Sequence, residues 1–198
     1  MIRRALGTAL GTAPATTLAP ALLGLSAANA GAYELAANRL TLVLRDDTHV
    51  SMTWFIDYPS ALHRALAPQR ALPEFVLLYS AMKPAEFQKE LLRAQAKFSA
   101  GTRLTRGAGE PLPVTNWQWP EAARAQALLQ ARAMQSLVAA GEHPTESRFE
   151  IRAEAGTARP VDAVAIRSPD EFGTVLVVSY RPPQAWAPAG SAPTSAKF

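Results

Sequence analysis

A strict alternation of apolar and polar residues between positions 39 and 57 constrains the fold of this chain more than any other feature. The apolar members of this pattern are Leu40, Leu42, Leu44, Val50, Met52, Trp54 and Ile56. Side chains two residues apart point to the same face of a strand, so each of the two runs predicts a half-buried strand. The polar residues 46–49 between the runs predict a turn, because aspartate side chains there can hydrogen-bond their own backbone. The segment is therefore predicted to form an antiparallel hairpin with one buried face.

Prolines mark the beginnings of three helices after this hairpin, expected over residues 59–66, 73–82 and 84–100. Proline at the first position of a helix loses no hydrogen bond, and Glu74 and Glu86 favour the second and third starts by interacting with the helix dipole. On the third helix the apolar residues recur at helical spacing. They predict a buried stripe made of Phe87, Leu91, Ala94 and Phe98.

The longest helix is expected from Pro120 to near Gly141. Its buried stripe is predicted to consist of small and apolar residues, namely Ala123, Ala127, Ala131, Met134, Leu137 and Val138. The predicted solvent-exposed face carries Glu121, Arg124, Arg132 and Gln135. Small residues along the stripe would allow this helix to lie close against a sheet.

The remaining segments predict strands. Residues 102–106 and 112–118 are expected to form a second hairpin, joined by a Gly-containing turn at 107–111. Alternation predicts a half-buried strand over 148–155 and a weaker strand over 161–167. Residues 174–180 are apolar on both faces, which favours a central strand. The predicted fold class is α+β, with one antiparallel sheet of about six or seven strands and three or four helices packed on it.

The first thirty residues have the pattern of a signal peptide. Arg3 and Arg4 form a basic start, residues 18–28 are apolar, and Ala28 and Ala30 supply the small residues before a cleavage site. Glycine, threonine and proline interrupt the apolar stretch too often for a membrane-spanning helix.

The expected organisation is therefore an exported chain with a signal peptide at 1–30, one periplasmic α+β domain at 31–181 and a loosely held Pro/Ala-rich tail at 182–198. No transmembrane segment is expected after cleavage of the signal peptide. Whether the leader is cleaved or is retained as an anchor stays open.

Composition excludes several kinds of chemistry. The 198 residues include no cysteine, which rules out disulfide scaffolds, iron–sulfur clusters, thiolate zinc sites and cysteine nucleophiles. The 20 Lys and Arg residues are scattered among 16 Asp and Glu without a basic block, which argues against nucleic acid as a partner. No phosphate-binding loop or G-x-S-x-G motif occurs, and prolines follow Gly107 and Gly109 where a dinucleotide-binding helix would begin. No cofactor is expected and no catalytic residue is assigned.

Asn116, Trp117 and Trp119 form the candidate site for a ligand or a partner. On a strand the two indoles would share one face, where paired aromatic rings can stack on a sugar or hold a peptide. The same rings can instead cover the core where the strand leads into the helix at Pro120. Both interpretations stay open.

The polar turn of the first hairpin is a candidate metal site. Asp46, Asp47 and His49 could converge on a metal ion at its tip, but aspartates are also ordinary turn formers. The other two histidines are His63 and His143, and no two of the three stand at a spacing that places both imidazoles on one face.

Residues 40–66 resemble the extracytoplasmic N-terminal region of the hydrogenase- and urease-accessory membrane proteins. In that family a signal peptide precedes a hairpin with a tryptophan in its second strand, and an acidic segment leads into a helix. Trp54, Ile56, Asp57 and Leu62 occupy comparable places in this chain. The resemblance implies a metal-handling accessory role and transfers no functional residue.

The leading functional hypothesis is a non-catalytic binding or accessory module for an envelope protein or a cell-wall component. It rests on the expected export, the sheet-rich architecture and the lack of a recognisable catalytic motif. Two alternatives remain. One is an envelope hydrolase whose serine, histidine and acid come together only in the folded chain, and the other is a metal-handling accessory protein.

Overall fold

The computed structural model describes residues 38–107, 109–137 and 148–182. All of them belong to a single unit of the chain, Ala36–Phe198. The strands are β1 (Asn38–Asp46), β2 (His49–Asp57), β3 (Arg103–Arg106), β4 (Glu110–Leu112), β5 (Val114–Gln118), β6 (Arg148–Gly156), β7 (Val164–Arg167) and β8 (Val175–Tyr180). The helices are α2 (Tyr58–Leu66), α3 (Leu72–Ser80), α4 (Pro84–Gly101), α5 (Ala122–Leu137) and the short 3₁₀ helix η1 (Asp170–Phe172).

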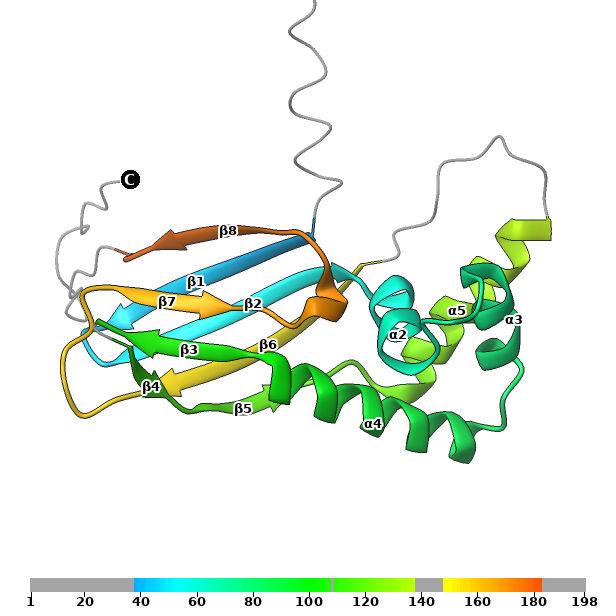
Figure 1. Cartoon of the computed structure of the whole chain (residues 1–198), viewed down its shortest axis with the longest axis horizontal. Helices are drawn as coiled ribbons and strands as arrows, with labels where there is room; N and C mark the ends of the chain where they lie inside the picture. Colours follow the sequence, from blue (N-terminus) through cyan, green and yellow to red (C-terminus); the bar gives the residue numbers. More distant parts are fainter. Residues whose placement is uncertain (1–37, 108, 138–147, 183–198) are drawn as a thin grey trace, which may run out of the picture. The chain divides into compact units, whose positions relative to one another are not determined.

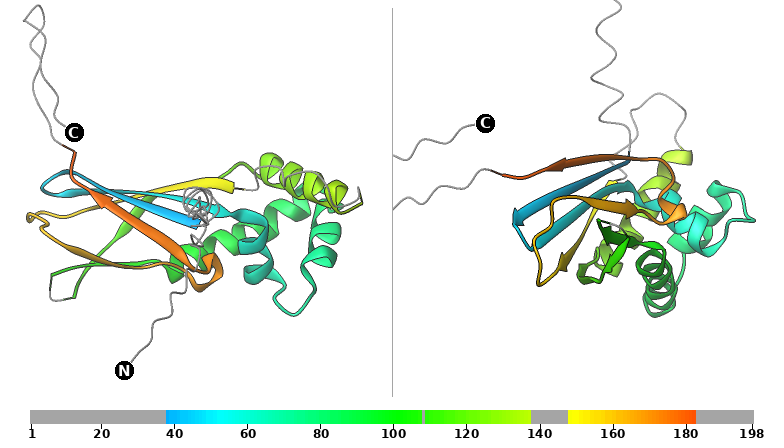
Figure 2. Two further views of the ribbon diagram at one scale, coloured as in Figure 1. Left: turned by 90° about the horizontal axis from the view of Figure 1, so that it is seen from above. Right: turned by 60° about the vertical axis from the view of Figure 1, so that its left-hand side comes forward.

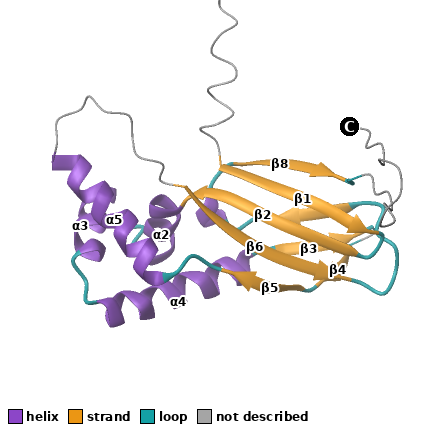
Figure 3. Ribbon diagram, turned by 180° about the vertical axis from the view of Figure 1, so that it is seen from behind, coloured by secondary structure: helices purple, strands orange, loops and turns teal. Residues whose placement is uncertain are grey.

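The described strands form two sheets, a larger one in the order β5-β6-β2-β1-β8 and a smaller one in the order β4-β3-β7. The α-helices of the described part lie together at one end of the strands (Figure 1), and none of them crosses the outer face of the larger sheet (Figure 3). The α+β class is therefore confirmed. The expectation of one antiparallel sheet with six or seven strands is wrong, because the larger sheet has five strands and three others form a sheet of their own.

The first hairpin forms as predicted. β1 and β2 pair antiparallel from Arg39 and Phe55 to Asp46 and His49. The carboxylate of Asp46 accepts hydrogen bonds from the backbone N–H of Thr48, at 2.8 Å, and from its hydroxyl, at 3.0 Å, which fixes the turn. Six of the predicted inward side chains are buried, namely Leu40, Leu42, Val50, Met52, Trp54 and Ile56. The seventh, Leu44, is half-buried.

β8 lies at the edge of the larger sheet, where the sequence predicted a central strand. Among the described strands it pairs only with β1, and the pairing is parallel, so this sheet is mixed. Parallel strands require a crossover, which the chain makes from the smaller sheet through η1 (Figure 2). The apolar pattern on both faces misled the prediction, because Leu176, Val177, Val178 and Tyr180 remain exposed.

The second hairpin is confirmed only in its first half. β3 and β4 pair antiparallel, with Leu104 opposite Leu112, and β7 pairs with the other side of β3. The segment predicted as one strand over 112–118 divides at Pro113, which has no N–H to donate to a ladder. After Pro113 the chain enters the larger sheet, where Val114 of β5 lies opposite Ala155 of β6. The two sheets are thus covalently connected on the β4–β5 side.

Helices α2, α3 and α4 form where the prolines predict them. Asp57 caps α2, because its carboxylate accepts hydrogen bonds from the Ser60 N–H, at 3.4 Å, and from the Ser60 hydroxyl, at 2.6 Å. The predicted stripe of α4 is confirmed, since Phe87, Leu91, Ala94 and Phe98 are all buried.

Helix α5 buries a different face from the one predicted. Ala125, Gln126, Leu129 and Ala133 point inward, whereas Ala123, Ala127, Ala131 and Met134 are exposed. The amide of Gln126 donates to the carbonyl of Met82 at 2.7 Å, just beyond the end of α3. A polar residue therefore belongs to the buried face of α5, which an apolar pattern does not reveal. The side chains of Leu137 and Val138 lie outside the described residues.

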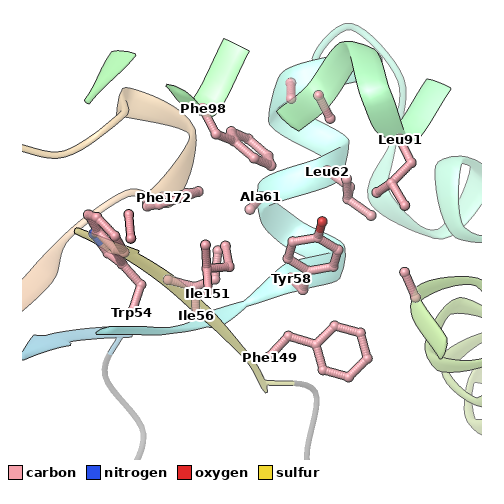
Figure 4. Close-up of a cluster of buried hydrophobic side chains, with 14 of the residues drawn as sticks. Trp54, Ile56, Tyr58, Ala61, Leu62, Leu91, Phe98, Phe149, Ile151 and Phe172 are labelled. Atoms are coloured by element: carbon pink, nitrogen blue, oxygen red, sulfur yellow. The ribbon is translucent and has the colours of Figure 1, made fainter. Parts of the chain in front are cut away.

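One aromatic core connects the sheets to the helices. Phe98 of α4 and Phe172 of η1 lie between the helical end and the strands, with ring centroids 4.9 Å apart, and Tyr58 lies 5.4 Å from Phe149 of β6 (Figure 4). Trp54 is fully buried in the same cluster. The expected signal peptide and all but the first residue of the expected tail fall outside the described residues.

Candidate functional site

The outer face of the larger sheet is hollowed by a cavity of about 460 Å³, called here the outer-face cavity. Its walls come from all five strands of that sheet. They combine hydroxyl, amide, guanidinium and carboxylate groups with two aromatic rings, and the lining includes Ser51, Phe55, Asn116, Arg152, Glu154 and Tyr180. The alternation of β1, β2 and β6 creates this face, because the residues between the buried ones point to the opposite side of the sheet.

Glu154 lies at the centre of the polar groups. The side-chain amide of Asn116 donates to its Oε2 at 3.0 Å, and Nε2 of His49 lies 3.7 Å from the same oxygen. The hydrogen bond from Asn116 lowers the pKa of Glu154, and the nearby His49 and Arg45 act in the same direction, whereas desolvation opposes them. The carboxylate is therefore ionised at neutral pH and held in one position as a hydrogen-bond acceptor.

Asn116 has a left-handed backbone, with φ of 52°, and no other residue besides glycine has a positive φ in the described ranges. The β5–β6 ladder shifts register between Thr115 and Gln118, as in a β-bulge. A left-handed asparagine at a bulge redirects its side chain, here toward Glu154 on the neighbouring strand. Such strained positions concentrate at functional sites.

Ser51 faces Glu154 across the β2–β6 ladder. Its hydroxyl is buried, and none of the described residues forms a hydrogen bond with it. Unpaired buried hydroxyls are rare because each loses its hydrogen bonds with water on folding. Ser51 therefore places an unpaired, buried hydroxyl in the wall of the outer-face cavity.

The structure separates Asn116 from the two tryptophans predicted to act with it. Trp117 and Trp119 stack with centroids 4.8 Å apart and an interplanar angle of 4°, and Trp117 also stacks on Trp54 at 5.4 Å. Trp119 lies 6.1 Å from Phe98. Both indoles are half-buried against the hydrophobic core, on the inner side of the larger sheet. Their rings are in contact with other rings of the protein, and only Asn116 lines the outer-face cavity.

The structure does not bring the candidate metal ligands together. Asp46 holds Thr48 within the turn, Oδ1 of Asp47 pairs with Nη2 of Arg181 at 3.0 Å, and His49 points to Glu154. Across the ranges that the structure describes, no three or more His, Asp or Glu residues are placed to share a metal ion. His63 is bonded to the carbonyl of Arg70 at 2.8 Å, and His143 lies outside the described residues.

Sequence reasoning missed Ser51, Arg152 and Glu154 as site residues. A signal for two of them existed, because Arg152 and Glu154 belong to the charged outer side of the strand predicted over 148–155. Their grouping with Asn116 depends on the pairing of β5 with β6, two strands that α5 separates in the sequence.

The fold and the site define a mixed two-sheet domain with a polar outer sheet face that none of the described helices crosses. Comparisons of the chain with protein-family models, curated proteins and solved structures gave no match. Among the described helices, none combines the length and the apolar character needed to span a membrane.

Proposed function

We propose that the protein is a non-catalytic binding module of the periplasm, and that the outer-face cavity is its ligand-binding surface. The fixed carboxylate of Glu154 carries this proposal. Asn116 adopts a strained backbone and donates to Glu154, and the unpaired hydroxyl of Ser51 lies opposite it. A set of preoriented polar groups on a sheet face that no described helix crosses can bind a ligand without a large entropic cost.

The proposed ligand is a hydroxyl- and amide-bearing component of the cell wall, of the saccharide class. Glu154 offers an acceptor, Arg152 offers donors, and the hydroxyls of Thr41 and Thr53 can do both. The rings of Phe55 and Tyr180 flank these groups and can stack on the apolar face of a sugar. This mixture of neutral, paired and aromatic groups suits a polyhydroxylated ligand better than a nucleic acid.

The test is cosedimentation of the purified chain with insoluble peptidoglycan, followed by calorimetry with soluble glycan fragments. Glu154→Gln removes the charge of the central acceptor and Asn116→Ala removes the group that holds it. Each is expected to weaken binding about ten- to a hundredfold, the range for hydrogen bonds to charged groups. Arg93→Ala on α4, which breaks an exposed pair with Glu90, is the control and is expected to bind normally. Equal binding by all variants would rule the surface out.

An envelope protein is the other proposed class of partner. Crosslinking in cells followed by capture of the tagged chain tests this class of partner. Glu154→Gln is the variant that is expected to lose the partner. A partner that is lost from this variant and retained by Arg93→Ala would place a protein on the same surface. Capture that is the same for both variants would contradict a protein partner at the outer-face cavity.

A hydrolase is the second candidate function, because His49, Ser51 and Glu154 lie on one face and His49 approaches the acid at 3.7 Å. A serine nucleophile also needs a hydrogen bond to its base, and the Ser51 hydroxyl has none among the described residues. Hydrolysis of an activated ester that is lost in Ser51→Ala would support this alternative. The same low background rate in the wild type and in Ser51→Ala would exclude it.

A metal-handling accessory role is the third candidate, motivated by the resemblance of residues 40–66 to the accessory membrane proteins and by the polar turn that contains Asp46, Asp47 and His49. Metal analysis of protein purified without chelator tests it, with His49→Ala as the paired variant. Metal that is bound by the wild type and absent from His49→Ala would support this role. A wild-type protein without bound metal would contradict it.

A further inference from the structure

The geometry points to a second binding site, an apolar cavity between the two sheets that accepts a single acyl chain. This cavity, called here the seam cavity, has a volume of about 530 Å³. Leu42, Leu44 and Val50 line it from β1 and β2, Val177 from β8, and Val164 and Ile166 from β7 of the smaller sheet. Its volume falls in the range of sites that hold small molecules.

The position of the seam cavity follows from how the sheets are connected. They are joined through Pro113 on the β4–β5 side, but β8 of one sheet and β7 of the other do not pair with each other. On this open side Val177 is 46 % exposed, although it points between the sheets. The space above β1, β2 and β8 is therefore accessible and is not filled by the side chains of the described residues.

The seam cavity lies between the faces of the sheets, not along an edge. Three neighbouring strands of the larger sheet form one wall, so an extended peptide added in plane to the edge of β8 would not reach Leu42 or Val50. Lining residues run from Val177 to Arg181, a span of roughly 13 Å at the usual rise of a strand. This length along the strands fits a linear ligand.

The chemistry of the lining selects a hydrocarbon. Most of the lining consists of aliphatic side chains from both sheets, and Ser179, Asp162 and Arg181, which also line it, are all exposed. Asp162 and Arg181 lie at the end near the β1–β2 turn. Arg181 is paired with Asp47 there, and both side chains are more than half exposed. A saccharide or peptide in the interior would leave polar groups unpaired, whereas an acyl chain would not. Its polar end would lie at the Arg181 end.

The test measures binding of a fluorescent undecanoic acid to the full chain, and it uses two neighbouring residues of β8 as a matched pair. Val177→Lys places a charge in the seam cavity. Leu176→Lys places the same charge on the next residue, which is 41 % exposed and does not line the cavity. The expected result is a loss of affinity of about tenfold or more in Val177→Lys and none in Leu176→Lys. Ile166→Lys, on the other sheet, is expected to behave as Val177→Lys does.

Displacement of the probe by a free fatty acid or by a lysophospholipid then distinguishes the two sources of the acyl chain. Three results would overturn the proposal. The first is no binding by the wild type. The second is equal loss in Leu176→Lys, which would indicate the edge of β8. The third is binding that occurs only in Trp186→Ala, which would make residues 183–198 of the chain itself the occupant. Glu154→Gln is expected to bind the probe normally, so this test is independent of the proposed function.

Discussion

Nη1 of Arg132, on α5, lies 2.9 Å from Oδ1 of Asp57, the residue that ends β2 and caps α2. The same carboxylate accepts the backbone and hydroxyl hydrogens of Ser60. The side chain of Asp57 thus connects the larger sheet to the α-helices α2 and α5. Both partners are only about one third exposed, so water weakens this pair less than it weakens a pair on the open surface.

Asp57→Ala is expected to lower the free energy of unfolding by about 1–2 kcal/mol, because it removes a helix cap and an ion pair together. Arg132→Ala should cost less, about 0.5–1 kcal/mol, because the cap remains. Urea unfolding of the two single variants and the double variant measures the coupling between the residues. Additive losses would show that the pair contributes nothing of its own.

Trp117→Ala is expected to destabilise the protein by about 2–4 kcal/mol, because the indole stacks between Trp54 and Trp119 and is packed against the core. Trp117→Phe should recover much of the loss, since a ring remains in the stack. Thermal and urea unfolding measure both effects. A variant that unfolds like the wild type but no longer captures a partner would instead identify the tryptophans as a binding platform.

Two alanines on α5 test which face of that helix is buried. Ala125 is fully buried and Ala123 is exposed. Ala125→Leu is expected to cost about 1–3 kcal/mol through overpacking, whereas Ala123→Leu should stay within about 0.5 kcal/mol of the wild type. A larger loss in Ala123→Leu than in Ala125→Leu would contradict this assignment. It would indicate that the stripe predicted from the sequence is the buried one.

Tyr58 is expected to make stability fall at alkaline pH. Burial raises the pKa of its hydroxyl well above the usual value of about 10, and the side chain of Gln95 lowers this pKa by a smaller amount. The unfolded chain therefore loses this proton above pH 10 while the folded chain keeps it. The contribution of Tyr58 to the free energy of unfolding is therefore fully present below pH 10 and decreases as the pH rises above that value.

Tyr58→Phe isolates this contribution. At pH 7 its free energy of unfolding should exceed that of the wild type by about 1 kcal/mol, because the buried hydroxyl that it removes has no hydrogen-bond partner among the described residues. Its advantage should grow above pH 10. Tyr79 also has a raised pKa, so the quantity to follow is the difference between the two proteins and not the wild-type curve alone. A difference that is constant from pH 7 to 11 would contradict the assignment.

The sequence allowed correct prediction of elements whose buried residues are large and whose spacing is unambiguous. On β2 the spacing of Met52 and Trp54 identifies a single buried face. On α4 the spacing of Phe87 and Phe98 does the same. Helix α5 lacks this information, because alanines occur on every side and Gln126 is buried through a hydrogen bond to the carbonyl of Met82. The position of β8 was predicted wrongly because its residues are apolar on both faces of the strand. That pattern indicated a central strand, but most of these residues are exposed.

The candidate site depends on information that no local pattern contains. Asn116 and Glu154 are 38 residues apart, and they meet because β5 pairs with β6 through a register shift. The pattern of the chain around 114–118 indicated a strand with two tryptophans on one side, which the ring stacking agrees with. It did not indicate that Asn116 would adopt a left-handed backbone and turn to the outer face.

The parallel pairing of β8 with β1 has a consequence for biosynthesis. Asn38 donates to the carbonyl of Phe172, 134 residues later, and the first described strand receives its outer neighbour from the last one. While the ribosome still holds the C-terminal part of the chain, the free side of β1 has no strand to bind. The larger sheet is therefore complete only once β8 has been made and has paired with β1, and until then the free edge of β1 can pair with strands of other chains.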